Sequence, residues 1–124
     1  MKTMAILGML AAAAGIAGSN ITPAELGARK DSPLLLDVRS PAEFAAGHIP
    51  GAWNVPVDDV AARREEIRNR AGKKDIVVYC LSGARAAHAI KELASDAGPQ
   101  VLHLTGDFSG WAAAQRPIEK GSAK

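Results

Sequence analysis

The sequence has a single cysteine, few aromatic residues and no run of charges of one sign. One thiol, Cys80, excludes an internal disulfide, a CxxC redox pair and a zinc site built from cysteines. Lys and Arg number 15 and Asp and Glu number 13, and this near-neutral balance gives no indication of nucleic-acid binding. Aromatic residues make up 4% of the chain, so the core must be aliphatic. The lone thiol is therefore either a packing residue or a nucleophile.

The first 19 residues are typical of an export signal. Lys2 precedes a stretch of small and apolar residues that runs from Met4 to Ala17, and we expect cleavage after Ala17. The stretch is shorter than the ~20 residues of a membrane span, and no cysteine lies near it to carry a lipid, so we expect no stable membrane anchor. The alternative is a buried Ala-rich helix, which its glycines would weaken. We predict a signal peptide over residues 1–19 and a periplasmic or secreted protein.

Beyond residue 19, predicted strands alternate with predicted helices. The chain of 124 residues, 48% hydrophobic and 23% charged, allows one globular domain. Apolar runs predict strands at residues 34–38, 52–55, 75–79 and 101–104, and helices are expected at 23–30, 41–46, 58–71 and 84–97, with a last short helix opened by Trp111. Thr22 and Ser40 each begin a capping box, in which Pro follows and Glu stands three positions on. This alternation predicts an α/β fold with a parallel sheet covered on both faces.

Cys80 directly follows one predicted strand and precedes a predicted helix. Ligands of parallel α/β folds bind beyond the carboxyl ends of the strands, where amides that enter a helix form a cradle for anions. We expect such amides to converge on the sulfur and to keep it ionised and open to solvent, because a helix N-terminus favours the thiolate. Gly83 permits a tight loop, and Arg85 supplies a cation for an oxyanion. The alternative is a buried structural cysteine, which is the commoner fate of a free thiol.

Three motifs in order resemble the signatures of rhodanese domains, the sulfurtransferase family. They are residues 35–39 with their continuation through 41–44 and 47–52, residues 77–85, and residues 106–111, where Thr105 stands at a position that is often glycine. The likeness covers residues 20–121 and leaves 122–124 as a tail. With the signal-like start, it is nearest to the exported single-domain type associated with phage-shock operons. It implies a single rhodanese-like domain of the α/β class, with a mostly parallel five-stranded sheet flanked by helices on both faces.

The resemblance implies that Cys80 carries a persulfide. Its thiolate would attack the sulfane sulfur of thiosulfate or a similar donor, sulfite would leave, and a thiol or cyanide acceptor would then take the sulfur. The chemistry needs no metal or organic cofactor. The substrate-binding loop is implied to consist of Leu81, Ser82, Gly83, Ala84 and Arg85.

The length and charge of this loop bear on the reaction. Four residues separate Cys80 from Arg85, whereas the related dual-specificity phosphatases and arsenate reductases are recognised by one residue more. The shorter loop favours sulfur transfer over phosphate-ester hydrolysis. Many members that use thiosulfate carry basic side chains within the loop, but Leu81, Ser82 and Ala84 are uncharged. Thiosulfate is a dianion, so we expect it either to bind weakly or to be replaced by another donor.

Two other functions compete with sulfur transfer. The same fold serves as a non-catalytic persulfide carrier or docking module, although a degenerate module has no need of an intact Cys80, Gly83 and Arg85. A cysteine phosphatase or arsenate reductase is the second rival. Ser82 is expected either to donate a hydrogen bond to the persulfide or to shape the turn.

Asp37, Arg39 and His48 are predicted to support the site rather than to react. Asp37 and Arg39 end a buried strand and are expected to form an ion pair that braces the loops, with a place near the pocket as the alternative. His48 is expected to be a hydrogen-bonded structural residue, since an existing thiolate needs no base. The three histidines are dispersed without the spacing of metal ligands, so no metal site is predicted. His88 is expected on a solvated face, and the sequence indicates neither a partner for His103 nor an oligomeric state.

Overall fold

The computed structural model describes residues 19–95 and 98–122. Within those two ranges, no helix is both long enough and apolar enough to cross a membrane. The predicted signal peptide at residues 1–19, and with it the alternative of a buried N-terminal helix, lies outside the described residues apart from Ser19.

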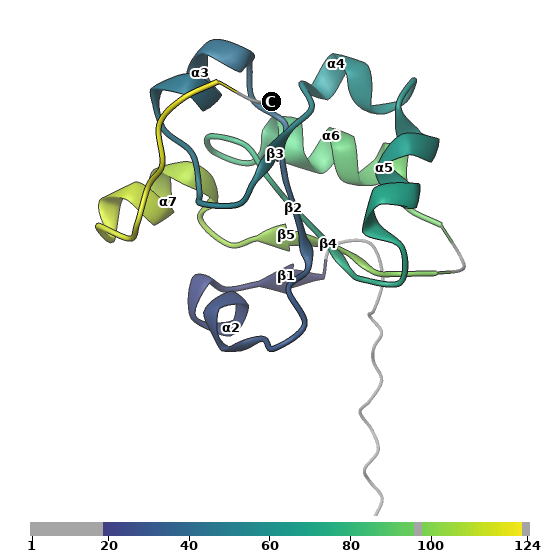
Figure 1. Cartoon of the computed structure of the whole chain (residues 1–124), viewed down its shortest axis with the longest axis horizontal. Helices are drawn as coiled ribbons and strands as arrows, with labels where there is room; N and C mark the ends of the chain where they lie inside the picture. Colours follow the sequence, from purple (N-terminus) through teal and green to yellow (C-terminus); the bar gives the residue numbers. More distant parts are fainter. Residues whose placement is uncertain (1–18, 96–97, 123–124) are drawn as a thin grey trace, which may run out of the picture.

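One sheet of five parallel strands forms the centre of the domain, in the order β1-β5-β4-β2-β3 (Figure 1). The strands are β1 (Asn20–Ile21), β2 (Leu34–Asp37), β3 (Trp53–Asn54), β4 (Ile76–Tyr79) and β5 (Val101–Leu104). The predicted α/β class and parallel five-stranded sheet are confirmed. β1 was not predicted from its own residues, because two residues show no pattern. It exists through its pairing with β5, which places Asn20 opposite His103.

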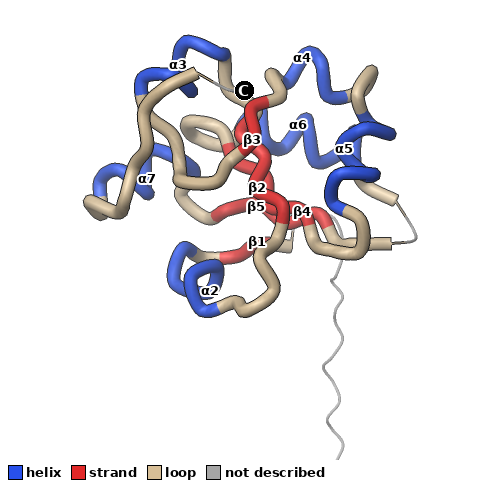
Figure 2. The backbone as a smooth tube through the Cα atoms, viewed as in Figure 1, coloured by secondary structure: helices blue, strands red, loops and turns tan. Residues whose placement is uncertain are grey.

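Helices cover both faces of the sheet, as Figures 1 and 2 show. They are α2 (Pro23–Ala28), α3 (Pro41–Ala46), α4 (Val57–Val60), α5 (Arg64–Ala71), α6 (Ala84–Leu93) and α7 (Asp107–Ala113). One core lies beneath α4, α5 and α6 and includes Val60, Ile67 and Leu93. The other core includes Trp111 of α7, with Leu26 of α2 packed against it. The two apolar layers bury both faces of the central strands, as their continuous apolar sequences predict.

The alternation of side chains along β4 decides which way Cys80 points. Ile76 and Val78 belong to the core beneath α6, whereas Val77 and Tyr79 belong to the core beneath α7. Successive side chains of a strand point to opposite faces. Cys80 continues the pattern one residue beyond the strand and joins the core beneath α6.

Both predicted capping boxes are present. The Thr22 hydroxyl accepts a hydrogen bond from the Glu25 amide at 3.0 Å, and the Glu25 carboxylate accepts one from the Thr22 amide at 2.9 Å. Ser40 and Glu43 form the same reciprocal pair at the start of α3. Each box satisfies amides that the first helical turn leaves without an intrahelical partner.

The helix expected at residues 58–71 is two helices. α4 ends at Val60, Arg63 leaves the helical conformation at φ −104° and ψ 17°, and α5 begins at Arg64. Val60 and Ile67 stand seven positions apart and both reach the same core, as they would on one unbroken helix. The spacing of the apolar residues therefore gives no sign of the break between α4 and α5.

Two further helix predictions were wrong at their ends. The helix expected to reach Ala97 ends at Leu93, where the guanidinium groups of Arg68 and Arg64 hydrogen-bond to the carbonyl groups of Leu93 and Ala94. The last helix was expected to open at Trp111 but begins at Asp107, after Gly106 adopts a positive φ of 85°. The strand expected at 52–55 is the shorter β3.

Asp37 and Arg39 form a buried ion pair at the end of β2. The Arg39 Nη2 atom lies 2.7 Å from the Asp37 carboxylate and donates a further 2.7 Å hydrogen bond to the Gly47 carbonyl. The guanidinium also lies 4.2 Å from the centre of the Phe108 ring. Because Gly47 follows α3 and Phe108 belongs to α7, one side chain connects the end of β2 to both helices.

Replacing Asp37 tests this buried pair. Asp37→Ala leaves the Arg39 guanidinium buried without its counter-ion, and we expect a loss of about 3–5 kcal/mol in the free energy of unfolding. Urea unfolding followed by circular dichroism measures the loss. Glu66→Ala is the matched control, because it breaks an exposed ion pair with Arg63 and should cost less than about 1 kcal/mol. Equal costs for the two variants would contradict the bracing role.

Candidate active site

The structure places Cys80 at the carboxyl end of β4, directly before the loop that leads into α6. The residue is 1% exposed and packs among core residues that include Val38 and Ala86. The expectation of a sulfur open to solvent is therefore wrong. The physical reason is that the strand before Cys80 is buried on both faces and the residue continues its inward alternation. A molecule that reacts with this sulfur must therefore reach the base of the loop.

One backbone amide holds the sulfur. The Gly83 amide donates a hydrogen bond to Cys80 Sγ at 3.0 Å. Among the described residues, no other backbone amide donates to this sulfur. The predicted ring of amides is thus a single contact. Gly83 adopts φ 125° at the N-cap of α6, a conformation that side chains disfavour. A Cβ added here would make only ordinary contact with the Asp107 carboxylate, at 3.4 Å, so it is the backbone conformation that favours glycine.

Asp107 fixes the peptide group of Cys80 from the neighbouring strand–helix turn. Its carboxylate accepts a hydrogen bond from the Cys80 amide at 3.0 Å and contacts His103 Nε2 at 2.9 and 3.0 Å. Asp107 is buried and adopts a positive φ of 52°. Such a backbone conformation costs of the order of 1 kcal/mol for a residue other than glycine, and it persists where surrounding contacts demand it.

The start of α7 completes this attachment. The Phe108 amide donates to the Cys80 carbonyl at 2.9 Å, and the Ser109 amide donates to the Leu81 carbonyl at 3.1 Å. The amide and the carbonyl group of Cys80 are therefore both held by the first two residues of α7. Asp107 was not predicted as a site residue, because it reaches Cys80 across 27 positions of the chain. His103 was left without a partner although Asp107 stands only four positions on, because their contact depends on the turn between β5 and α7. The available signal was an acidic residue directly after a glycine at a predicted strand–helix turn.

Arg85 forms a bidentate ion pair with Glu43, a residue that was predicted as part of a capping box and not as part of the site. The Arg85 Nη1 and Nη2 atoms lie 2.8 and 3.1 Å from the two Glu43 carboxylate oxygens. The hydrogen bond from Arg85 holds the pKa of Glu43 at about 2, well below its ordinary value. The cation expected to face an oxyanion is thus already paired, although its side chain is still 36% exposed.

The remaining loop residues form an uncharged rim. Leu81 is 41% exposed, and Ser82 and Ala84 are also exposed. The structure therefore brings the predicted loop together beside Cys80, with a buried thiol and an apolar or neutral outer surface.

His48 and His88 make their polar contacts with residues other than Cys80. His48 is buried, bonds the Phe44 carbonyl through Nδ1 at 2.8 Å and stacks on the Phe44 ring at 3.6 Å. His88 is exposed and lies 3.8 Å from Glu92 on the next turn of α6. Across residues 19–95 and 98–122, no three His, Cys, Asp or Glu side chains come close enough to hold a metal ion.

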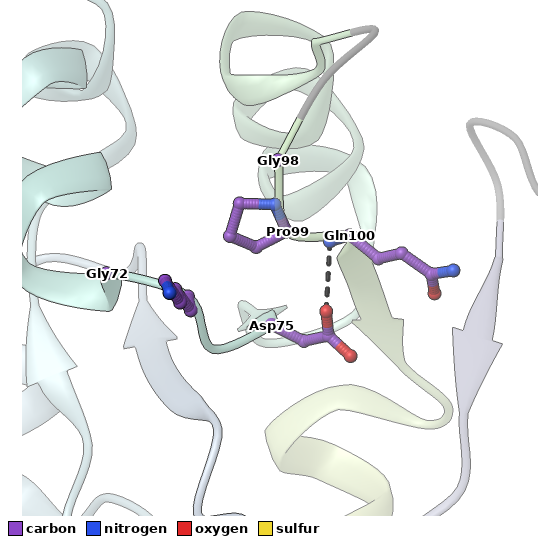
Figure 3. A pocket seen from close by; sticks show the side chains of 6 residues that line it. Gly72, Asp75, Gly98, Pro99 and Gln100 are labelled. Carbon is purple, nitrogen blue, oxygen red and sulfur yellow. Dashed lines mark hydrogen bonds between the residues drawn. The ribbon is translucent and has the colours of Figure 1, made fainter.

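A pocket of about 460 Å³ lies at the amino ends of β4 and β5, opposite the end of the sheet that carries Cys80 (Figure 3). Its lining comprises Gly72, Lys73, Asp75, Gly98, Pro99 and Gln100. Asp75 and Gln100 precede β4 and β5, whereas Cys80 follows β4, so the pocket lies away from the sulfur. The Asp75 carboxylate accepts a hydrogen bond from the Gln100 backbone amide at 3.0 Å and forms an ion pair with Arg29 at 3.1 Å.

Comparison with known proteins assigns this arrangement to a family. Residues 22–114 match the model of the Rhodanese-like domain. The chain belongs to the rhodanese-like domain family. Sulfurtransferases occur in this family, and the resemblance in the sequence motifs is confirmed at that level. The likeness to the phage-shock type and the domain bounds 20–121 stay predictions.

Proteins of several descriptions are similar to this chain. A sulfurtransferase of Allochromatium vinosum is 40% identical over 68% of this chain and 77% of its own length. An HTH-type transcriptional regulator of Mycobacterium tuberculosis is 39% identical over 90% of this chain, which spans only 50% of that protein. The solved thiosulfate sulfurtransferase of Pseudomonas aeruginosa is similar with a TM-score of 0.70 and 30% identity, over 84% of this chain and 20% of that one.

The carboxylate of Asp107 gives a direct test of how Cys80 is held. Asp107→Ala leaves the buried Cys80 amide without an acceptor, so we expect a loss of about 1–3 kcal/mol in the free energy of unfolding and faster hydrogen exchange of that amide. Asp107→Asn retains an acceptor oxygen and should preserve most of the protection. Urea unfolding and amide exchange measured by NMR report the two effects. Undiminished protection of the Cys80 amide in Asp107→Ala would contradict the assignment.

Proposed function

We propose that this rhodanese-like domain is a sulfurtransferase that carries sulfur as a persulfide on Cys80. The observation that carries the proposal is the hydrogen bond from the Gly83 amide to Cys80 Sγ within a strand–loop–helix turn. An amide that points at the sulfur stabilises negative charge there, both on the thiolate and on the persulfide that replaces it. Thiosulfate or a related sulfane-sulfur compound is the donor, and a thiol or cyanide is the acceptor.

The reaction proceeds in two displacements. The Cys80 thiolate attacks the outer sulfur of thiosulfate, a new S–S bond forms, and the old S–S bond breaks with its electron pair leaving on sulfite. The acceptor then attacks the terminal sulfur of the persulfide and returns Cys80 to the thiolate. Charge and atoms balance in each step, so neither a metal nor an external redox partner is required.

Phosphate-ester hydrolysis is the rival chemistry for a cysteine at this place. A Rhodopseudomonas palustris structure described as a possible tyrosine phosphatase is similar, with a TM-score of 0.69 and 27% identity. The four-residue spacing between Cys80 and Arg85 argues against that chemistry here. The pairing of Arg85 with Glu43 adds to this argument, because a phosphate-ester dianion would have to compete with a bound carboxylate.

We also propose that the protein is exported. The support is the signal-like composition of residues 1–19. Cleavage after Ala17 would leave β1, which begins at Asn20, intact at the edge of the sheet. Sequencing the N-terminus of the mature protein tests this point.

Intact mass spectrometry tests the sulfurtransferase proposal. Incubation with thiosulfate should add one sulfur atom to the wild-type protein, and a later acceptor thiol should remove it with turnover. Cys80→Ser should stay unmodified while it keeps the wild-type circular dichroism spectrum, because the single thiol is the sulfur carrier. Turnover separates an enzyme from a passive carrier. Hydrolysis of an aryl phosphate without sulfur loading would overturn the proposal.

A further inference from the structure

The charges around the active-site loop cancel. Arg85 is the only charged side chain in the loop from Cys80 to Arg85, and both of its terminal nitrogens contact Glu43. Because two parallel hydrogen bonds between ions fix both groups, the pair offers little net charge to a substrate. The hydrogen bonds to Glu43 raise the pKa of Arg85, so the pair stays ionised and bound.

The charged groups behind the loop are also engaged. Arg39 is buried against Asp37 and is thus directed inward. Asp107 places a buried carboxylate against the Cys80 amide, with His103 as its partner. No unpaired cation belongs to the described loop or to the side chains that hydrogen-bond to it. A dianion that approaches the thiolate of the proposed reaction therefore meets a neutralised surface.

The outer surface of the loop suits an organic group. Leu81, next to the sulfur-bearing residue, is one of two large hydrophobic side chains that are strongly exposed among the described residues. The uncharged Ser82 and Ala84 are exposed beside it. An aliphatic substituent on the donor would remove part of the Leu81 side chain from water, whereas the sulfonate oxygens of thiosulfate would gain nothing from that contact.

We propose that the preferred donor is a singly charged organic sulfane-sulfur compound, of the thiosulfonate or persulfide type, rather than the thiosulfate dianion. This inference rests on the proposed sulfurtransferase function. With a thiosulfonate, the Cys80 thiolate attacks the outer sulfur, the S–S bond breaks, and its electron pair leaves on the sulfinate. Two negative charges meet in that step, whereas three meet with thiosulfate. The difference matters most where no free cation screens the approach.

Methanethiosulfonate is the probe for wild-type selectivity, because it delivers the same outer sulfur with one charge fewer than thiosulfate. Rates of Cys80 loading are measured for both donors and divided by their rates with a free thiol in solution, which removes the difference in intrinsic reactivity. We expect the normalised second-order rate constant to favour methanethiosulfonate. A normalised preference for thiosulfate would overturn the inference without the help of any variant.

Glu43→Gln tests the cause of the preference. Glutamine keeps an oxygen for the capping box of α3, but it removes the charge that neutralises Arg85. Because the interaction energy scales with the donor's charge, we expect KM to fall about fivefold for thiosulfate and about twofold for methanethiosulfonate. Glu66→Gln is the matched control, since it removes the same charge from the exposed Arg63–Glu66 pair of α5 and should leave both KM values unchanged.

The outcomes separate this inference from the proposed function. If Glu43→Gln and Glu66→Gln change KM for thiosulfate equally, the donor preference does not arise from Arg85 and the inference fails. If both donors load Cys80 but thiosulfate is preferred, the inference fails while the sulfurtransferase function stands. If neither donor loads Cys80, the function itself fails.

Discussion

The position of Cys80 depends on one buried carboxylate. Asp107 holds the Cys80 amide at 3.0 Å from the turn between β5 and α7, and it does so from a backbone conformation that is costly for an aspartate. With the peptide group fixed, the sulfur lies where the Gly83 amide can reach it. The loop from Cys80 to Arg85 makes a tight turn of its own, but the turn between β5 and α7 fixes its position through Asp107. The site is therefore a property of two adjacent strand ends rather than of one motif.

Charge pairing organises the surroundings of the sulfur. Asp37 with Arg39, and Glu43 with Arg85, place two acids and two bases in ion pairs at the carboxyl edge of the sheet. The buried pair braces the loops, while the partly exposed pair takes away most of the net charge that a cationic loop would present. Within the described residues, the sulfur is contacted by the Gly83 amide rather than by a free cation. In the proposed function, this arrangement links the structural ion pairs to the choice of sulfur donor.

Local signals in the sequence predicted most of the fold. Both capping boxes, the buried strands and the order of elements follow from short-range chemistry at Thr22, Ser40 and the apolar runs. The motifs also placed Cys80 at a strand end before a helix. What escaped prediction depends on contacts distant in the chain: β1 exists only beside β5, and Asp107 acts on a residue 27 positions away. The burial of Cys80 combines both kinds of cause, because the residue continues the inward alternation of β4 and packs beneath α6.

The amide of Gly83 reports most directly on whether the sulfur of Cys80 is the reacting atom. In a nitrogen–proton correlation NMR spectrum, we predict that loading one sulfur onto the protein moves the Gly83 amide resonance more than any amide outside the loop. That change should reverse when an acceptor thiol removes the sulfur, and it should be absent in Cys80→Ser. A loaded protein whose Gly83 resonance stays in place would contradict the assignment of this amide as the group that stabilises the persulfide.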